Sequence, residues 1–239
     1  MSETNTKSTV AAYFKEVIYG GIDGIITTFA VVSGFSGAAL SNDATVQASF
    51  VIVLLFGLAN LFADAVSMGL GNFLSVRAEK DLYNVQRIKE RELIRRDPEL
   101  EVDETVEIMI GKGFSENDAR TLAAIYRHNE EYWLDFMMNN EYEMSDPRGD
   151  NPALTGFSTF AAFLVFGSIP LLPFFFLSDA SSSALFQVSA VGTMIALILL
   201  GLLKWRVVGT SLWRSVLEVV LVGSVAAVIA FMVGTFFSI

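Results

Sequence analysis

Two acidic side chains lie in stretches of sequence that are otherwise apolar, Asp23 in the first such stretch and Asp64 in the second. An ionisable group inside a bilayer is costly, and it usually serves a function there. Asn60, Asp64 and Met68 recur at four-residue spacing, so they share one face of a helix. Oxygen ligands beside a thioether suit a transition-metal cation better than sodium or calcium. Asp23 and Met68 therefore favour a cation path, whereas Asp64 fits equally well a polar seam between packed helices.

A second set of candidate metal ligands lies in a polar segment farther along the chain. Three glutamates recur at every third residue, and two methionines lie three and four residues before another glutamate. These residues are Glu101, Glu104, Glu107, Met137, Met138 and Glu141. Carboxylates beside thioethers suit Fe²⁺ or Mn²⁺, but acidic runs on helices are usually solvated and methionines usually fill cores. From residue types alone, the solvated acidic face is the favoured interpretation.

Long apolar stretches must position the first set of candidates. A transmembrane helix needs about 20 mainly apolar residues. Five stretches meet this requirement, namely residues 17–40, 48–76, 154–177, 184–205 and 212–237. The chain is 53% hydrophobic and only 18% charged over its 239 residues. The sequence therefore predicts an all-α integral membrane protein with five transmembrane helices in contact with the lipid bilayer.

The polar segment predicts a separate helical part between the second and third spans, called here the insert. Residues 79–150 hold 19 of the 26 acidic and 10 of the 16 basic residues. A charged helix continues the second span, and Asp97-Pro98 is a start signal for the next helix. A third helix begins near Ser115, either unbroken or with a break at Asn129. The expected parts are residues 1–78, 79–150 and 151–239.

Composition excludes several classes of function. The chain has no basic face for nucleic acid, so no nucleic-acid partner is expected. The absence of cysteine removes disulfides and thiolate metal sites, and a single histidine, His128, removes His-rich sites and Ser-His-Asp catalysis. The sequence contains no glycine-rich phosphate loop. We expect no enzyme activity and no prosthetic group.

The distribution of Lys and Arg predicts the orientation in the membrane. All 16 of these residues precede the first span, lie between the second and third spans, or lie near the junction of the fourth and fifth. Loops rich in Lys and Arg face the cytoplasm. We therefore expect a cytoplasmic amino terminus and insert, with the carboxyl terminus on the far side. The expected location is a bacterial inner membrane, with a vacuolar membrane as the alternative.

Several long strings, in their order and spacing, resemble the vacuolar iron transporter family, bacterial members included. These strings cover residues 20–34, 59–71 and 133–138, and the resemblance extends over almost the whole chain. It implies five spans with a three-helix cytoplasmic metal-binding insert. It also implies a homodimer that carries Fe²⁺, and often Mn²⁺, out of the cytosol in exchange for protons, along a path between the subunits.

The resemblance also implies which membrane residues serve the path. The family's Asp and Met ligands fall on Asp23 and Met68, and a further acidic or amide position falls on Asn60. An amide coordinates a cation but takes no proton. The proton exchanged for metal is therefore expected on Asp23 or Asp64, because a carboxylate must be deprotonated to bind metal.

In the insert, the resemblance implies two Glu-x-x-Glu pairs followed by Met-Met-x-x-Glu. One carboxylate of the first pair is replaced by Leu93, so we expect fewer or more weakly held ions than in a full member. Glu107 is a possible substitute. The implied ligands are Glu90, Glu101, Glu104, Met137, Met138 and Glu141. The resemblance thus reverses the interpretation favoured by residue types alone.

Two other functions fit parts of the sequence. A membrane-anchored metal sensor or buffer would need only the insert, but an anchor does not require the costly Asp23 and Met68 in the membrane. An intramembrane aspartyl protease would need Asp23 and Asp64 to share a proton, but the glycines around them match no such family. Metal transport is the leading hypothesis.

Overall fold

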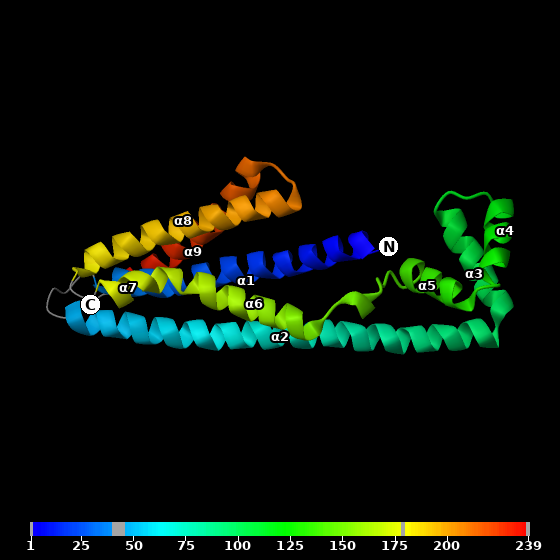
Figure 1. Ribbon diagram of the computed structural model, residues 1–239, viewed down its shortest axis with the longest axis horizontal. Helices are drawn as coiled ribbons and strands as arrows, with labels where there is room; N and C mark the ends of the chain where they lie inside the picture. The colour runs from blue at the N-terminus through cyan, green and yellow to red at the C-terminus, as the bar shows by residue number, and fades with distance from the viewer. Residues whose placement is uncertain (1, 40–45, 178–179, 238–239) are drawn as a thin grey trace. The chain divides into compact units, whose positions relative to one another are not determined.

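A computed structural model describes residues 2–39, 46–177 and 180–237, and all regular elements in these ranges are helices (Figure 1). The chain forms two compact units. The membrane unit comprises residues 1–73 and 152–239, and the insert unit comprises Leu74–Asn151. Each unit has a buried core of its own.

Five helical segments are long and apolar enough to cross a membrane: Tyr13–Ala38, Val51–Arg96, Pro152–Phe176, Ser182–Val208 and Leu212–Phe236. The prediction of an all-α membrane protein with five spans is therefore confirmed. Helix α2 (Val46–Arg96) has 51 residues, which corresponds to roughly 75 Å at 1.5 Å per residue. Because a span needs only about 20 residues, this helix continues well beyond its apolar part, as its sequence predicts.

The third span is divided rather than continuous. Helix α6 (Pro152–Gly167) is followed by a single 3₁₀ turn, η3 (Ile169–Leu171), and by the short helix α7 (Leu172–Phe176). Pro170 has no N–H to donate and interrupts the helical pattern. The hydroxyl of Ser189 donates a hydrogen bond of 2.7 Å to the carbonyl of Pro170. A neighbouring helix thus satisfies a backbone group that the break leaves free, as a membrane requires.

Helix α1 (Ser2–Ala39) packs closely against α6 at two glycines. A Cβ added to Gly20 would lie 2.7 Å from the carbonyl oxygen of Thr159, and one added to Gly24 would lie 2.6 Å from that of Phe163. These distances are too short for a real Cβ, so only glycine permits this approach of the two backbones. Small residues serve the same purpose at many helix interfaces in membranes.

The last two spans complete the membrane unit. Helices α8 (Ser182–Val208) and α9 (Leu212–Phe236) pack against α1 and against each other. Much of their surface is exposed and apolar, as expected of lipid-facing helices. The buried core of the unit includes Phe29, Val32, Leu61, Ala65, Phe163 and Leu185.

The insert unit adds three short helices to the polar end of α2, namely α3 (Pro98–Gly111), α4 (Glu116–Tyr126) and α5 (Glu130–Asn140). Each begins after a side chain that accepts a hydrogen bond from a backbone N–H of its first turn. Asp97 and Ser115 cap the first two, as predicted, and Asn129 caps α5 by accepting from the N–H of Tyr132. The third predicted helix is therefore two helices, broken before Asn129.

Arginines of α2 hold α5 in place. The guanidinium of buried Arg87 donates to the hydroxyl of Tyr83 at 3.2 Å, to the carboxylate of Glu131 at 2.7 Å and to that of Asp135. Arg91 donates to Glu131 at 2.7 Å. Because one planar guanidinium serves several acceptors at fixed angles, these ion pairs define the rotation of α5 about its axis.

Candidate metal centre

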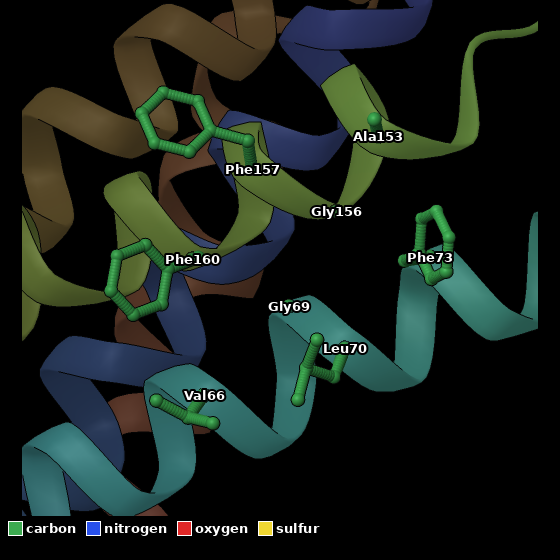
Figure 2. A pocket seen from close by; sticks show the side chains of 8 residues that line it. All are labelled: Val66, Gly69, Leu70, Phe73, Ala153, Gly156, Phe157 and Phe160. Carbon is green, nitrogen blue, oxygen red and sulfur yellow. The ribbon is translucent and has the colours of Figure 1, made fainter.

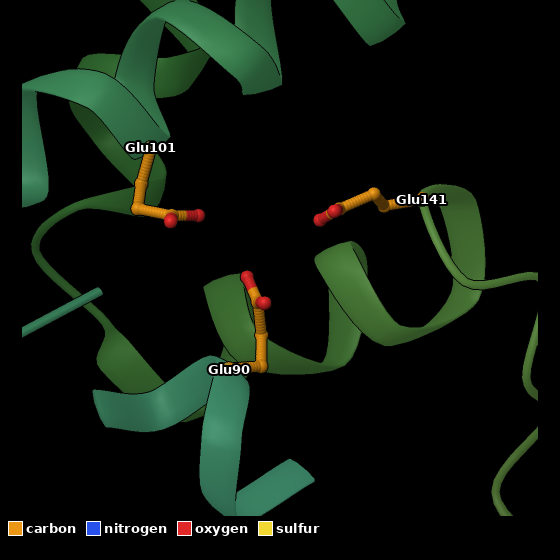
Figure 3. A group of neighbouring side chains, drawn as sticks. All are labelled: Glu90, Glu101 and Glu141. Carbon is orange, nitrogen blue, oxygen red and sulfur yellow. The ribbon is translucent and has the colours of Figure 1, made fainter. Parts of the chain in front are cut away.

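Three glutamates from separate parts of the insert unit converge. Glu90 lies on α2, Glu101 on α3, and Glu141 directly after α5. One carboxylate oxygen of each lies within 4.8 Å of the others, and Figure 3 shows the three side chains directed toward a common space. Oxygen ligands bind hard divalent ions at about 2.0–2.6 Å. Small side-chain movements therefore suffice for all three carboxylates to bind one ion.

Two oxygens of this cluster are buried and unpaired. Glu90 is fully buried and Glu101 is 2% exposed. Oε1 of Glu90 and Oε2 of Glu101 have no hydrogen-bond partner among the residues that the structure describes, although Oε2 of Glu90 accepts from the hydroxyl of Tyr142 at 2.9 Å. A buried carboxylate oxygen without a partner is costly. The cluster is therefore suited to bind a cation or a proton.

Crowding changes the acidity of the cluster. Burial, followed by the charge of Glu90, raises the pKa of Glu101 to about 8. Burial is also the main cause of the raised pKa values of Glu104 and Glu141, and the charge of Glu90 adds to both. At neutral pH the cluster therefore holds a proton, and a divalent ion must displace that proton in order to bind.

The other predicted ligands of the insert lie around this cluster. Met137 and Met138 are buried in the core of the insert unit, and Sδ of Met137 lies 3.3 Å from the hydroxyl oxygen of Thr105. Glu104 is half-buried and interacts with the charges of the cluster, whereas Glu107 is exposed and neighbours Glu104. The structure thus brings three predicted carboxylates together and leaves the other two at the edge.

Two residues beside the candidate centre were not found from the sequence. The hydroxyl of Tyr142 binds Glu90, and the hydroxyl of Thr105 contacts Met137. Tyr142 directly follows Glu141, and Thr105 lies one turn after Glu101. Nothing in these spacings distinguishes them from ordinary helix residues, because their roles depend on contacts between different helices.

In the membrane unit, the predicted path residues lie on α1 and α2. The amide of Asn60 donates a hydrogen bond of 2.8 Å to the carboxylate of Asp64. The carboxylate of Asp64 is close enough to that of Asp23 for their charges to interact. Met68 is half-buried and packs against the apolar core of the unit. The structure therefore brings Asn60, Asp64 and Asp23 into one polar neighbourhood, with Met68 one turn beyond Asp64 on the same helix.

A second polar group in the membrane unit joins three helices. The amide of Asn72 on α2 donates to the carboxylate of Glu16 on α1 at 2.5 Å and to the hydroxyl of Thr159 on α6 at 2.7 Å. That hydroxyl in turn donates to Glu16 at 3.1 Å. Sequence analysis did not group these residues. One feature of the sequence pointed to Glu16: it lies seven residues before Asp23, so both residues lie on the same face of α1.

The pocket in Figure 2 lies between α2 and α6 and has a different character. Its volume is about 400 Å³. Its lining consists almost entirely of carbon, from Val66, Gly69, Leu70, Phe73, Ala153, Gly156, Phe157 and Phe160. These side chains offer no metal ligand, so the pocket is not a candidate cation site.

Comparisons with known proteins identify the family of the chain. Residues 14–235 match the sequence model of the VIT family. The chain is 35% identical to a vacuolar iron transporter of Toxoplasma gondii, covering 98% of this chain and 76% of that protein. It is 32% identical to vacuolar iron transporter 1 of Arabidopsis thaliana, covering 95% and 87%, and 34% identical to a vacuolar iron transporter of Plasmodium berghei, covering 93% and 81%. The chain belongs to the VIT family.

Proposed function

We propose that this protein moves Fe²⁺, and also Mn²⁺, out of the cytosol in exchange for protons, and that the insert collects the metal. One observation carries the proposal: three glutamates from distant parts of the insert converge with two buried, unpaired oxygens. Buried carboxylate oxygens of this kind are costly unless a cation or a proton satisfies them. The printed names of the relatives support iron as the cargo.

The donor chemistry of the insert supports a divalent transition metal. Carboxylates alone suit Mg²⁺, Ca²⁺ and Mn²⁺, whereas a thioether adds affinity for softer ions. Met137 and Met138 are buried in the same unit as Glu90, Glu101 and Glu141. Fe²⁺ and Mn²⁺ both accept this mixture. The insert also carries nine more acidic than basic residues, and this charge attracts cations before they bind.

Proton exchange is supported by carboxylates in both units. The raised pKa of Glu101 means that metal binding to the insert releases a proton near neutral pH. In the membrane unit, Asp23 and Asp64 are the carboxylates of the proposed path. Asn60 cannot take a proton, but its amide donates to Asp64 and orients that carboxylate. A proton on Asp23 or Asp64 weakens metal binding there and so couples the two fluxes.

We further propose a homodimer with the ion path between the subunits. Leu82, Val85 and Ile88 are 60%, 51% and 56% exposed on the α2 segment of the insert unit. Exposed apolar side chains in a highly charged segment are typical of a protein interface. A second copy of the same helix is the partner that this stripe fits. The Lys and Arg distribution supports a cytoplasmic insert.

Metal flux into liposomes that contain the purified full-length protein tests the proposal. Fe²⁺ and Mn²⁺ are compared with and without a proton gradient, for the wild type and for Asp23→Asn and Met68→Leu. Glu218→Gln is the matched control, because Glu218 is a carboxylate of α9 that pairs with Lys204 and Arg214 at the surface. We expect gradient-dependent flux that both path substitutions abolish and the control retains.

The other outcomes separate the parts of the proposal. Flux that does not depend on the gradient would remove proton coupling and keep metal transport. Flux that survives both path substitutions would move the path away from α1 and α2. Metal binding by the insert without flux of either ion would favour a membrane-anchored sensor or buffer.

A further inference from the structure

One buried hydroxyl joins the two helices that carry most of the candidate ligands. Thr105 of α3 is fully buried. Its Oγ1 donates to the carbonyl oxygen of Glu101 at 2.7 Å and lies 3.3 Å from Sδ of Met137. It also accepts a hydrogen bond of 2.8 Å from Nε1 of Trp133. Thr105 therefore contacts the backbone of one candidate ligand and the side chain of another.

The hydrogen-bonding capacity of these groups is limited. A hydroxyl has one proton and two lone pairs, and an indole N–H only donates. Trp133 therefore occupies one lone pair of Thr105, and the single proton is available either to the carbonyl of Glu101 or to the sulfur of Met137. A thioether is the weaker acceptor of the two. The sulfur is therefore held beside a polar partner, and because a thioether sulfur has two lone pairs, at least one of them remains available to a metal.

The spacing of these residues links the hydroxyl to the carboxylate cluster. Glu101 and Thr105 are one turn apart on α3, and Trp133, Met137 and Glu141 are each one turn apart along α5 and its end. Residues four apart lie on the same face of a helix. The bond between Trp133 and Thr105 therefore fixes both helices within two turns of their converging glutamates.

We propose that Thr105 and Trp133 are positioning residues that hold the Met137 thioether as a metal ligand, and that this held sulfur gives the insert its preference for thiophilic divalent ions over hard ones. The inference rests on the proposed metal site of the insert. Methionine has three rotatable bonds and adapts easily, so a sulfur without such support spends little time in a binding position. Groups that orient a metal ligand commonly change affinity by about 10–100-fold.

Equilibrium binding of Cd²⁺, a thiophilic ion, and Mn²⁺, a hard one, tests the inference. The full-length protein in detergent is titrated with each metal at pH 7, as wild type, Thr105→Val, Met137→Leu and the double variant. Valine has the shape of threonine without the hydroxyl. Thr105→Ser, which retains the hydroxyl, is the rescue control, and Trp133→Phe removes the indole N–H donor while an aromatic ring remains at this position.

We expect Thr105→Val to lower the ratio of Cd²⁺ to Mn²⁺ affinity by about tenfold. Met137→Leu should lower the ratio at least as much, and the double variant should lower it no further, because the hydroxyl acts through the sulfur. Trp133→Phe should have a smaller effect in the same direction, and Thr105→Ser should keep the wild-type ratio. The ¹³C-methyl resonance of Met137 should shift on Cd²⁺ binding in the wild type and in Thr105→Ser.

The ratio of Cd²⁺ to Mn²⁺ affinity distinguishes a positioning role of Thr105 from a purely structural one. If Thr105→Val weakens both metals equally, or if its effect adds to that of Met137→Leu, the inference is wrong although the metal site stands. If Thr105→Val fails to fold and so loses both affinities together, the ratio measured for Trp133→Phe against Thr105→Ser decides the question. If the wild-type insert binds neither metal, the proposed site itself is overturned, and the inference with it.

Discussion

The polar side chains of the two units are organised in opposite ways. In the insert unit, the carboxylates of Glu90 and Glu101 converge with like charges and leave two buried oxygens unpaired. In the membrane unit, Asn60 pairs with Asp64, and Asn72 pairs with both Glu16 and Thr159. The first arrangement is costly unless a proton or a cation satisfies its oxygens, whereas the polar groups named in the second satisfy one another through hydrogen bonds.

Under the proposed function, this difference corresponds to tight metal binding by the insert and weaker metal binding along the membrane path. A cluster of unpaired carboxylates gains much free energy when a cation arrives, which favours tight binding. A path whose polar groups already satisfy one another gains less, so an ion that enters it is also able to leave. Conduction requires binding that is favourable but not too strong.

Glu101→Gln removes a central carboxylate of the insert and should weaken metal binding there by roughly a hundredfold or more, since even substitutions that only disturb a ligand cost about 10–100-fold. The same change removes a repulsive buried charge, so the metal-free protein should become more stable at pH 8. Titration calorimetry and thermal unfolding in detergent measure the two effects. Glu92→Gln, at an exposed position of α2, should change neither, and a loss of stability in Glu101→Gln would contradict this expectation.

Metal affinity of the insert should rise with pH, by close to tenfold per pH unit below 8, because the raised pKa of Glu101 makes each bound ion displace about one proton. The stability of the metal-free protein should move in the opposite direction. The folded form holds this proton up to about pH 8, whereas the unfolded chain releases it near the ordinary value of 4.5. The free energy of unfolding should therefore fall as the pH rises between these two values.

Calorimetry in buffers of different ionisation enthalpy counts the displaced protons, and unfolding at pH 5 and pH 8 checks the second effect. Glu101→Gln provides the control for both measurements, since it removes the titrating group. An affinity that does not change with pH between 6 and 8 would show that Glu101 binds no proton in the folded protein.

Asn60→Leu should reduce metal flux by about tenfold, because it removes the hydrogen bond to Asp64, and hydrogen bonds to charged groups contribute about 1.5–3 kcal/mol. Metal binding by the insert should be unchanged. Liposome flux and calorimetry on the same preparation separate the two units. A parallel loss of insert binding would mean that the two polar regions are not independent.

Leu93→Glu should raise the metal affinity of the insert by about threefold to tenfold or should add one bound ion. A tenfold change corresponds to about 1.4 kcal/mol. Leu93 is half-buried and lies three residues after Glu90 on α2, so a carboxylate here adds to the cluster. The added charge should destabilise the metal-free protein at high pH. Glu92, which is exposed, offers the matched control in Glu92→Gln, and the ratio of bound metal to protein measures the stoichiometry.

Asn129→Ala should lower stability by about 1 kcal/mol, the usual contribution of a helix cap, because Asn129 caps α5 through the N–H of Tyr132. The ion pairs of Arg87 should keep α5 in place, so metal affinity should change by less than the effect of Leu93→Glu. Thermal unfolding of the metal-free protein measures the change. Asn129→Ser, which retains a capping oxygen, should restore most of the stability.

Hydropathy and charge predict most of the fold and much less of the candidate site. The five spans follow from the length of the apolar runs, and the start of α3 follows from Asp97-Pro98. The division of the third span does not follow from hydropathy. The break is satisfied by Ser189 of another helix, whose hydroxyl donates a hydrogen bond to the carbonyl of Pro170. Hydropathy averages over residues and does not register such a partner.

Single residues of the candidate centre were also difficult to predict from the sequence. Residue types favour a solvated face for Glu101, and only the resemblance to a family suggests otherwise. In the structure Glu101 is buried, because the face of α3 that carries it also carries Thr105 and packs toward Met137 of α5. Tyr142 and Thr105 escape sequence reasoning altogether. Their functions arise from contacts between helices, which no periodicity within one helix encodes.

The glycines of α1 have a mechanical consequence. Gly20 and Gly24 bring the backbones of α1 and α6 into close contact, and the hydroxyl of Thr159 on α6 donates a hydrogen bond to Glu16 on α1. This close packing favours movement of the two helices as one body, and Asp23 lies between the two glycines on α1. Under the proposed function, a movement that opens or closes the path around Asp23 is then expected from α2, which carries Asp64, rather than from α6.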